Sequence, residues 1–122
     1  MTHQQPQVLP HARSYLGDHG QLTISIVTRY EVLRGLKAKR AKVQVAAFDA
    51  LCGTLEIVAL SDAMIERAAD IYAELHQRGR MIGDADILIA ATAIEIGCGL
   101  ATNNEAHFSR IPGLAVENWL GQ

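Results

Sequence analysis

The sequence predicts a single α/β domain in which helices cover a parallel sheet. Short apolar runs typical of strands alternate with segments of helical periodicity. Capping residues mark where the helices begin and end. The 122 residues are enough for one sizeable core but not for two.

The first twenty residues carry weak signals. We expect residues 1–5 to be a disordered tail and residues 6–122 to form the domain. Apolar residues at helical spacing predict a short helix over 8–15, with Pro10 in its first turn. Residues 18–20 predict a turn.

The next segment alternates between strand and helix signals. Residues 22–24 alternate like a strand and lead into Ser25, a favourable N-cap for a helix over 26–36. Apolar residues at helical spacing over 43–50 predict a second helix, which ends at Gly53. The run 55–60 is rich in residues that favour strands and predicts another strand.

The second half repeats this alternation. Ser61 predicts the cap of a long helix that reaches about Gly79. A helix over 83–95 is apolar nearly all round, which predicts that it is buried. Residues 100–102 and 114–116 predict two short strands.

Composition excludes several classes of protein. With 49% hydrophobic and 20% charged residues, the chain is neither disordered nor fibrous. A formal charge of −2 gives no overall field for a polyanion. Cys52 and Cys98 lack metal-site spacing, which indicates reduced thiols. The longest apolar stretch, 87–96, is about half of the ~20 residues that a membrane helix needs, so we expect a cytoplasmic protein without membrane contact.

Carboxylates are the best candidates for chemistry, since no nucleophile elbow, phosphate loop or paired-histidine motif is present. Glu31 lies one turn inside the helix after the strand 22–24, where α/β folds form their ligand crevice. Compensation of the helix dipole, or pairing with Arg34, is the alternative explanation and, for this residue taken alone, the favoured one.

Two further acids precede the buried helix. Asp84 fits an N-cap. Asp86 is either a dipole-compensating residue or a metal ligand aimed into the crevice. Carboxylate oxygens suit hard cations such as Mg²⁺ and Mn²⁺. After the strand 100–102, Asn104 fits a turn, and Glu105 is either solvated or helps to bind an ion.

These stretches resemble one known family. The resemblance is carried by Thr28–Gly35, Gly83–Ala93 and Thr102–Phe108, followed by Pro112–Leu114 and Glu117–Trp119. In that order they look like a PIN domain of the VapC toxin type, over about residues 21–120.

The resemblance implies a PIN-like three-layer sandwich, with a parallel sheet flanked by helices. It also implies an endoribonuclease that depends on Mg²⁺ or Mn²⁺, forms a homodimer and is held inactive by a cognate antitoxin. Glu31 matches the second acidic residue of the family and Asp86 the third. Asn104 falls at the position of a fourth acidic residue, with Glu105 beside it. Asp84 matches a less constant acidic residue, and Thr102 matches the polar residue that ends the preceding strand.

The chain departs from the family at its start. The family's first strand, which lies in the middle of the sheet and carries the first acidic ligand, has no counterpart, and residues 6–20 look like the family's second helix. We therefore expect an N-terminally truncated sheet with its central strand missing, and weak or no activity.

A basic segment suggests how RNA would bind. Six of the eleven basic residues lie between positions 29 and 42. They are Arg29, Arg34, Lys37, Lys39, Arg40 and Lys42. This run is either an RNA contact, for which the first five are the candidates, or a solvated helix face.

Two functions follow from the sequence. The first is a metal-dependent endoribonuclease toxin that uses metal-activated water. The alternative is a degenerate PIN module that no longer cuts and instead binds an antitoxin or RNA. An unrelated α/β binding domain would not explain three motifs in the family's order.

Overall fold

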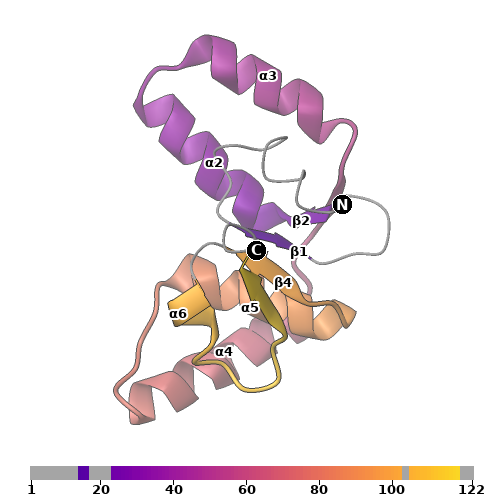
Figure 1. Cartoon of the computed structure of the whole chain (residues 1–122). Helices are drawn as coiled ribbons and strands as arrows, with labels where there is room; N and C mark the ends of the chain where they lie inside the picture. Colours follow the sequence, from indigo (N-terminus) through magenta and orange to yellow (C-terminus); the bar gives the residue numbers. More distant parts are fainter. Residues whose placement is uncertain (1–13, 17–22, 103–104, 119–122) are drawn as a thin grey trace.

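The computed structural model describes residues 14–16, 23–102 and 105–118. The predicted tail 1–5, most of the predicted helix 8–15, the turn 18–20 and the loop residue Asn104 lie outside these ranges. The elements are arranged in three layers around a five-stranded sheet of order β3-β2-β1-β4-β5 (Figure 1).

The strands are all three residues long. They are β1 (Ser14–Leu16), β2 (Thr23–Ser25), β3 (Glu56–Val58), β4 (Leu100–Thr102) and β5 (Val116–Asn118). The β2–β3 and β4–β5 pairs are parallel, with Thr23 opposite Glu56 and Leu100 opposite Val116. The predicted parallel pairing is therefore confirmed for both halves of the sheet.

The centre of the sheet corrects two predictions. Ser14–Leu16 is a strand rather than the end of a helix, and it runs antiparallel between β2 and β4. The central position is thus filled, not missing. The physical reason is backbone pairing: without β1, the facing edges of β2 and β4 would each present unpaired N–H and C=O groups inside the domain.

The first two helices form a hairpin on one side of the sheet. Helix α2 (Ile26–Ala38) begins where predicted, because the Ser25 side chain accepts a hydrogen bond from the Thr28 N–H at 2.9 Å. Helix α3 (Lys42–Cys52) follows after a tight turn in which Arg40 adopts a φ of 59°.

The remaining helices cover the other side (Figure 1). Helix α4 (Asp62–Gln77) is capped by Ser61 as predicted, and Gly79 takes the left-handed conformation beyond its end. Helix α5 (Asp84–Ile96) is capped by Gly83 rather than by Asp84, which corrects the predicted N-cap. The short helix α6 (Glu105–Phe108) was not predicted.

Two apolar cores lie on opposite faces of the sheet. Successive strand residues alternate between them: Ile57 and Ala101 pack with α2 and α3, whereas Val58 and Leu100 pack with α4 and α5. Helix α5 is buried as predicted, with Ile87, Ile89 and the run 90–93 in the larger core or fully enclosed. No helix within the described residues is long and apolar enough to span a bilayer.

Candidate functional site

The candidate site lies where β2 and β4 end and α2, α5 and α6 begin. Buried polar side chains mark this edge of the sheet: Ser25, Thr28 and Thr102 are all essentially inaccessible. The Ser25 hydroxyl also donates to the Thr28 hydroxyl oxygen at 3.3 Å. These contacts fix the direction in which α2 leaves the sheet, and so fix where the next turn of α2 places its side chains.

Glu31 lies on α2, one turn beyond Thr28. Its side chain is 15% exposed, and its Oε2 atom lies 3.6 Å from Nη2 of Arg34 on the next turn of the helix. Arg34 also lies over the ring of Tyr30, with 5.1 Å between the guanidinium carbon and the ring centroid. The predicted Glu31–Arg34 pair is therefore present, on a carboxylate that is mostly covered.

Asp86 lies in the first turn of α5, where the helix dipole favours a negative charge. Its side chain is 19% exposed, and its Oδ2 atom lies 3.4 Å from Nδ1 of His107 on α6. Asp84, two positions earlier, is exposed. Of the two acids at the start of α5, Asp86 is thus the one turned into the protein.

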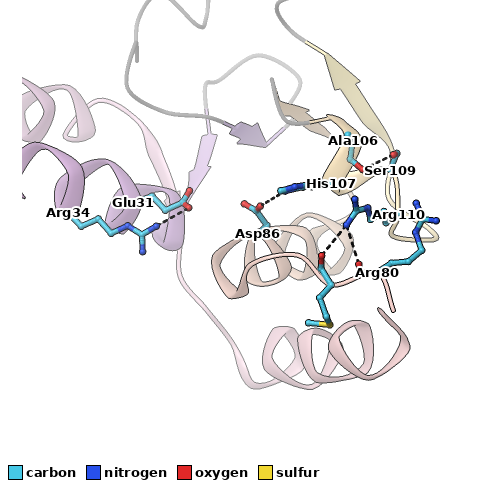
Figure 2. Close-up of polar contacts among 9 residues, drawn as sticks. Glu31, Arg34, Arg80, Asp86, Ala106, His107, Ser109 and Arg110 are labelled. Carbon is cyan, nitrogen blue, oxygen red and sulfur yellow. Dashed lines mark hydrogen bonds and ion pairs between the residues drawn. The ribbon is translucent and has the colours of Figure 1, made fainter. Parts of the chain in front are cut away.

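The two covered carboxylates face each other. Figure 2 shows Glu31 and Asp86 extending from α2 and α5 toward the same space, with His107 on the far side of Asp86. Helices α2 and α5 pack against one another. The structure thus brings together the two acids on which the sequence argument depends, from segments more than fifty residues apart.

The other candidate ligands are distributed differently. Thr102 is fully buried at the end of β4, and Glu105 is exposed at the start of α6. Asn104 lies outside the described residues. Across residues 14–16, 23–102 and 105–118, no three His, Cys, Asp or Glu side chains gather closely enough to hold a metal ion. The described part of the site therefore offers two carboxylates.

The chemistry of this donor set fits a hard divalent cation. Both donors are carboxylates, and sulfur ligands are absent from the described part of the site. Mg²⁺ retains several water molecules in proteins and is commonly held by only one or two carboxylates together with substrate phosphates. Two facing carboxylates are thus enough for a site that is completed by water and substrate.

The predicted RNA-contacting residues divide into two groups. Arg29 is tied to α3: its Nη2 atom lies 3.0 Å from Oδ1 of Asp49, and its guanidinium lies over the ring of Phe48. Interactions with Cys52 and, next, Asp49 raise the pKa of Arg29, so it stays cationic. Arg29 therefore joins two helices, and its role as an RNA contact stays a prediction.

The other basic residues gather at the turn between α2 and α3. Lys37, Lys39, Arg40 and Lys42 are exposed there. A surface hollow of about 400 Å³ lies beside this turn, with an apolar floor of Ala41, Val45 and Ala46. Lys37, Arg40 and Lys42 line it, together with Asp49.

Sequence reasoning missed His107. No HExxH-like pairing pointed to it, and the stretch 102–108 was considered for its amide and acidic residues alone. A usable signal was present nevertheless. His107 follows the end of a buried strand by five positions, and the carboxyl ends of strands are where α/β folds gather their polar groups.

Comparison with known families decides the identity of the fold. Residues 5–114 match the PIN domain family. The chain belongs to that family. The resemblance that the three motifs indicated is thereby confirmed.

Curated relatives in this family are ribonucleases by name. Ribonuclease VapC2 of Rickettsia felis is 34% identical over 105 residues, which cover 85% of this chain and 78% of the relative. Ribonuclease VapC1 of Methanocaldococcus jannaschii is 36% identical over 96 residues, covering 79% and 68%. The tRNA(fMet)-specific endonuclease VapC of Shigella flexneri is 30% identical over 103 residues, covering 84% and 78%.

Solved structures agree with this assignment. VapBC2 from Rickettsia felis, bound to a DNA fragment from its promoter, matches with a TM-score of 0.73 and 35% identity, covering 80% of this chain and 74% of the other. DNA-bound VapBC from Salmonella typhimurium matches with a TM-score of 0.77 and 26% identity, covering 98% and 86%. The PIN-like architecture predicted from sequence is confirmed.

Proposed function

We propose that this PIN domain is a metal-dependent endoribonuclease, the toxin of a toxin–antitoxin pair. The observation that carries the proposal is the facing pair of covered carboxylates, Glu31 and Asp86, at the edge of the sheet where β2 and β4 end. The names of the VapC relatives support RNA as the substrate.

Glu31 and Asp86 would hold an Mg²⁺ or Mn²⁺ ion. Glu105 would serve as an outer donor from the start of α6, and Asn104 stays a candidate from sequence alone. When bound, the cation supplies an activated water molecule and neutralises charge on the phosphate. Thr102 would support the site as a buried hydroxyl at the end of β4.

The remaining residues would bind and orient the RNA. The exposed cations Lys37, Lys39 and Arg40 would hold backbone phosphates at the α2–α3 turn. Arg34, which lies beside Glu31, would contact the phosphate nearest to the reacting centre.

We also propose partners and a location. The structural neighbours are toxin–antitoxin complexes by description, which supports a cognate antitoxin. Exposed Ile65 and Tyr72 on α4, with Ile96 on α5, support a homodimer. Cys52 and Cys98 are thiols that are not joined in a disulfide, which supports the reducing cytoplasm as its location.

One observation favours the alternative, a PIN module that binds without cutting. Two carboxylates hold less positive charge than a larger acidic cluster would, and no third joins them among the residues that the structure describes. We therefore expect slow cleavage at best, and we keep the binding module as the second candidate.

The test is cleavage of a mixed RNA pool with Mn²⁺ or Mg²⁺, by the wild type and the variants Glu31→Gln and Asp86→Asn. We expect metal-dependent cleavage that each variant reduces by about a hundredfold or more, the size of loss seen when one charge-stabilising group is removed. Asp84→Asn, which removes an exposed carboxylate from the same helix turn, is the matched control and should retain most activity.

Two outcomes would contradict the proposal. Cleavage that survives Asp86→Asn would show that the activity belongs to another site or to a contaminant. RNA binding without cleavage at any metal concentration would establish the binding module instead.

A further inference from the structure

His107 makes a long-range contact with the candidate metal ligand Asp86. Its Nδ1 atom lies 3.4 Å from Oδ2 of Asp86, across 21 positions of the sequence. An ionised carboxylate only accepts, so in the tautomer that carries its hydrogen on Nδ1 the His107 ring is the donor in this contact. The separation is longer than in most N–H···O bonds, so the contact contributes little to the stability of the fold.

Buried neighbours hold the histidine in place. Phe108 and Ile111 follow it and are 1% and 3% exposed in the larger core, whereas the His107 side chain is 42% exposed. Within the same segment, the Ser109 N–H donates to the Glu105 carbonyl oxygen at 2.9 Å. The backbone that carries the His107 imidazole is therefore held by buried side chains, while part of the ring is exposed to solvent.

The same segment is tied to the chain just before α5. Arg110 donates from Nη1 to the carbonyl oxygens of Arg80 and Met81, at 3.4 and 3.0 Å (Figure 2). In the other direction, Arg78 donates to the Arg110 carbonyl oxygen at 3.2 Å. These bonds connect the two backbone segments that carry His107 and Asp86, so the two side chains keep a fixed relation.

The position of His107 relative to the Asp86 carboxylate indicates the role of this contact. In Figure 2, Asp86 lies between Glu31 and His107, and the oxygen that contacts the histidine is the one away from Glu31. The other carboxylate oxygen is left on the side of Glu31. A donor that holds the outer oxygen of a ligand thus sets the orientation of the inner one.

We propose that His107 is a positioning residue for the metal site, which holds the Asp86 carboxylate in the orientation that binds the cation. This inference rests on the proposed function, because it requires that Asp86 be a ligand. His107 would act through Asp86 rather than as a ligand of its own, and this role depends on its N–H donor rather than on a change of charge.

The experiment compares Mn²⁺ binding, by isothermal titration calorimetry, in the wild type, His107→Ala and His107→Asn. Asparagine places an amide N–H near the position of Nδ1, so it restores the donor without the ring. We expect His107→Ala to weaken Mn²⁺ binding by about tenfold or more, as is typical for the partner of a metal ligand. We expect His107→Asn to stay within about threefold of the wild type.

The matched control is His76→Ala. His76 is exposed on α4, a helix that does not carry any of the candidate ligands, and its ring stacks on Tyr72. It should leave Mn²⁺ affinity unchanged. Thermal unfolding in EDTA separates positioning from folding, because a positioning residue leaves the midpoints of His107→Ala and His76→Ala within a few degrees of the wild type.

Three results would overturn the inference. Equal Mn²⁺ affinity in His107→Ala and the wild type would remove the role while leaving the proposed metal site intact. Loss of affinity in both His107 variants, with a lowered unfolding midpoint, would make the residue structural. Absence of Mn²⁺ binding in the wild type would overturn the proposed function and this inference together.

Discussion

The two candidate carboxylates are held in place in opposite ways. Glu31 on α2 is paired with Arg34, three residues away on the same helix and mostly exposed. Asp86 on α5 is contacted by His107, which belongs to another helix and is fixed by buried neighbours and backbone bonds. The Glu31–Arg34 pair is local to one helix, whereas the Asp86–His107 contact depends on the tertiary structure.

This difference assigns separate tasks to the two sides of the site. A carboxylate whose partner is a flexible surface cation can exchange that partner for another charge when substrate arrives, because exposed ion pairs contribute little. A carboxylate held by an anchored segment keeps its orientation throughout. We infer that α5 and α6 provide the fixed part of the site, and α2 and α3 the part that adapts to RNA.

The largest effect should come from removing the anchor of the fixed side. Phe108→Ala empties a fully buried position next to His107 and should lower the free energy of unfolding by about 3–5 kcal/mol. Urea denaturation measures this loss. Phe48→Ala, in the core beneath α2 and α3, is the matched control.

The comparison between the two phenylalanine variants sharpens the argument. At a temperature where both remain folded, Phe108→Ala should weaken Mn²⁺ binding, whereas Phe48→Ala should not. Equal effects on metal affinity would show that the α6 side is no more important for the site than the α2–α3 side.

A smaller effect is expected at the α2–α3 turn. Replacing Lys37, Lys39 and Arg40 with alanine should weaken RNA binding several-fold at low salt. It should also flatten the salt dependence, since each lost phosphate contact lowers the slope of log K against log salt by about 0.7 for a single strand. Fluorescence anisotropy with labelled RNA at several salt concentrations measures both quantities.

Lys42 and Glu56 variants help to interpret that result. Lys42→Ala removes a cation from the same turn that is not among the proposed phosphate contacts, and it should change the slope much less than the triple variant does. Glu56→Gln alters charge on β3, away from the turn, and should leave the slope unchanged. A triple variant with an unaltered slope would identify the run as a solvated helix face.

The smallest effect concerns the local ion pair. Arg34→Ala removes the partner of Glu31, yet stability should change by less than about 1 kcal/mol because Arg34 is mostly exposed. Mn²⁺ affinity should change less than it does in His107→Ala. The reverse order, with Arg34→Ala the more damaging variant, would contradict the division into a fixed and an adaptable side.

Most of the helices could be predicted from sequence because their signals are local. The side chains of Ser25 and Ser61 cap the N-termini of α2 and α4. Gly79 and Gly97 adopt the left-handed conformation at the C-terminal ends of α4 and α5. Glu31 and Asp86 could be proposed as site residues for a similar reason, since each lies near the predicted start of a helix at the edge of the sheet.

The errors arose where tertiary contacts decide the outcome. The apolar residues that lead into Ser14–Leu16 have helical spacing in the sequence, but pairing with β2 and β4 makes this segment a strand. Strands of three residues leave the register open, which explains the shift of β5 from 114–116 to Val116–Asn118. The contact between His107 and Asp86 could not be predicted, because it depends on how α5 and α6 pack at the edge of the sheet where β4 ends.

The short central strand has a mechanical consequence. One half of the sheet, β3 and β2, leads into the helix with Glu31, and the other half, β4 and β5, lies with the helices that bear Asp86 and His107. Among the described residues, the seam between these halves is Ser14–Leu16, which pairs with β4 along its length and with β2 through Leu16 opposite Thr23. Because α2 also packs against α5, this helix contact and the seam together set the gap between the two acids.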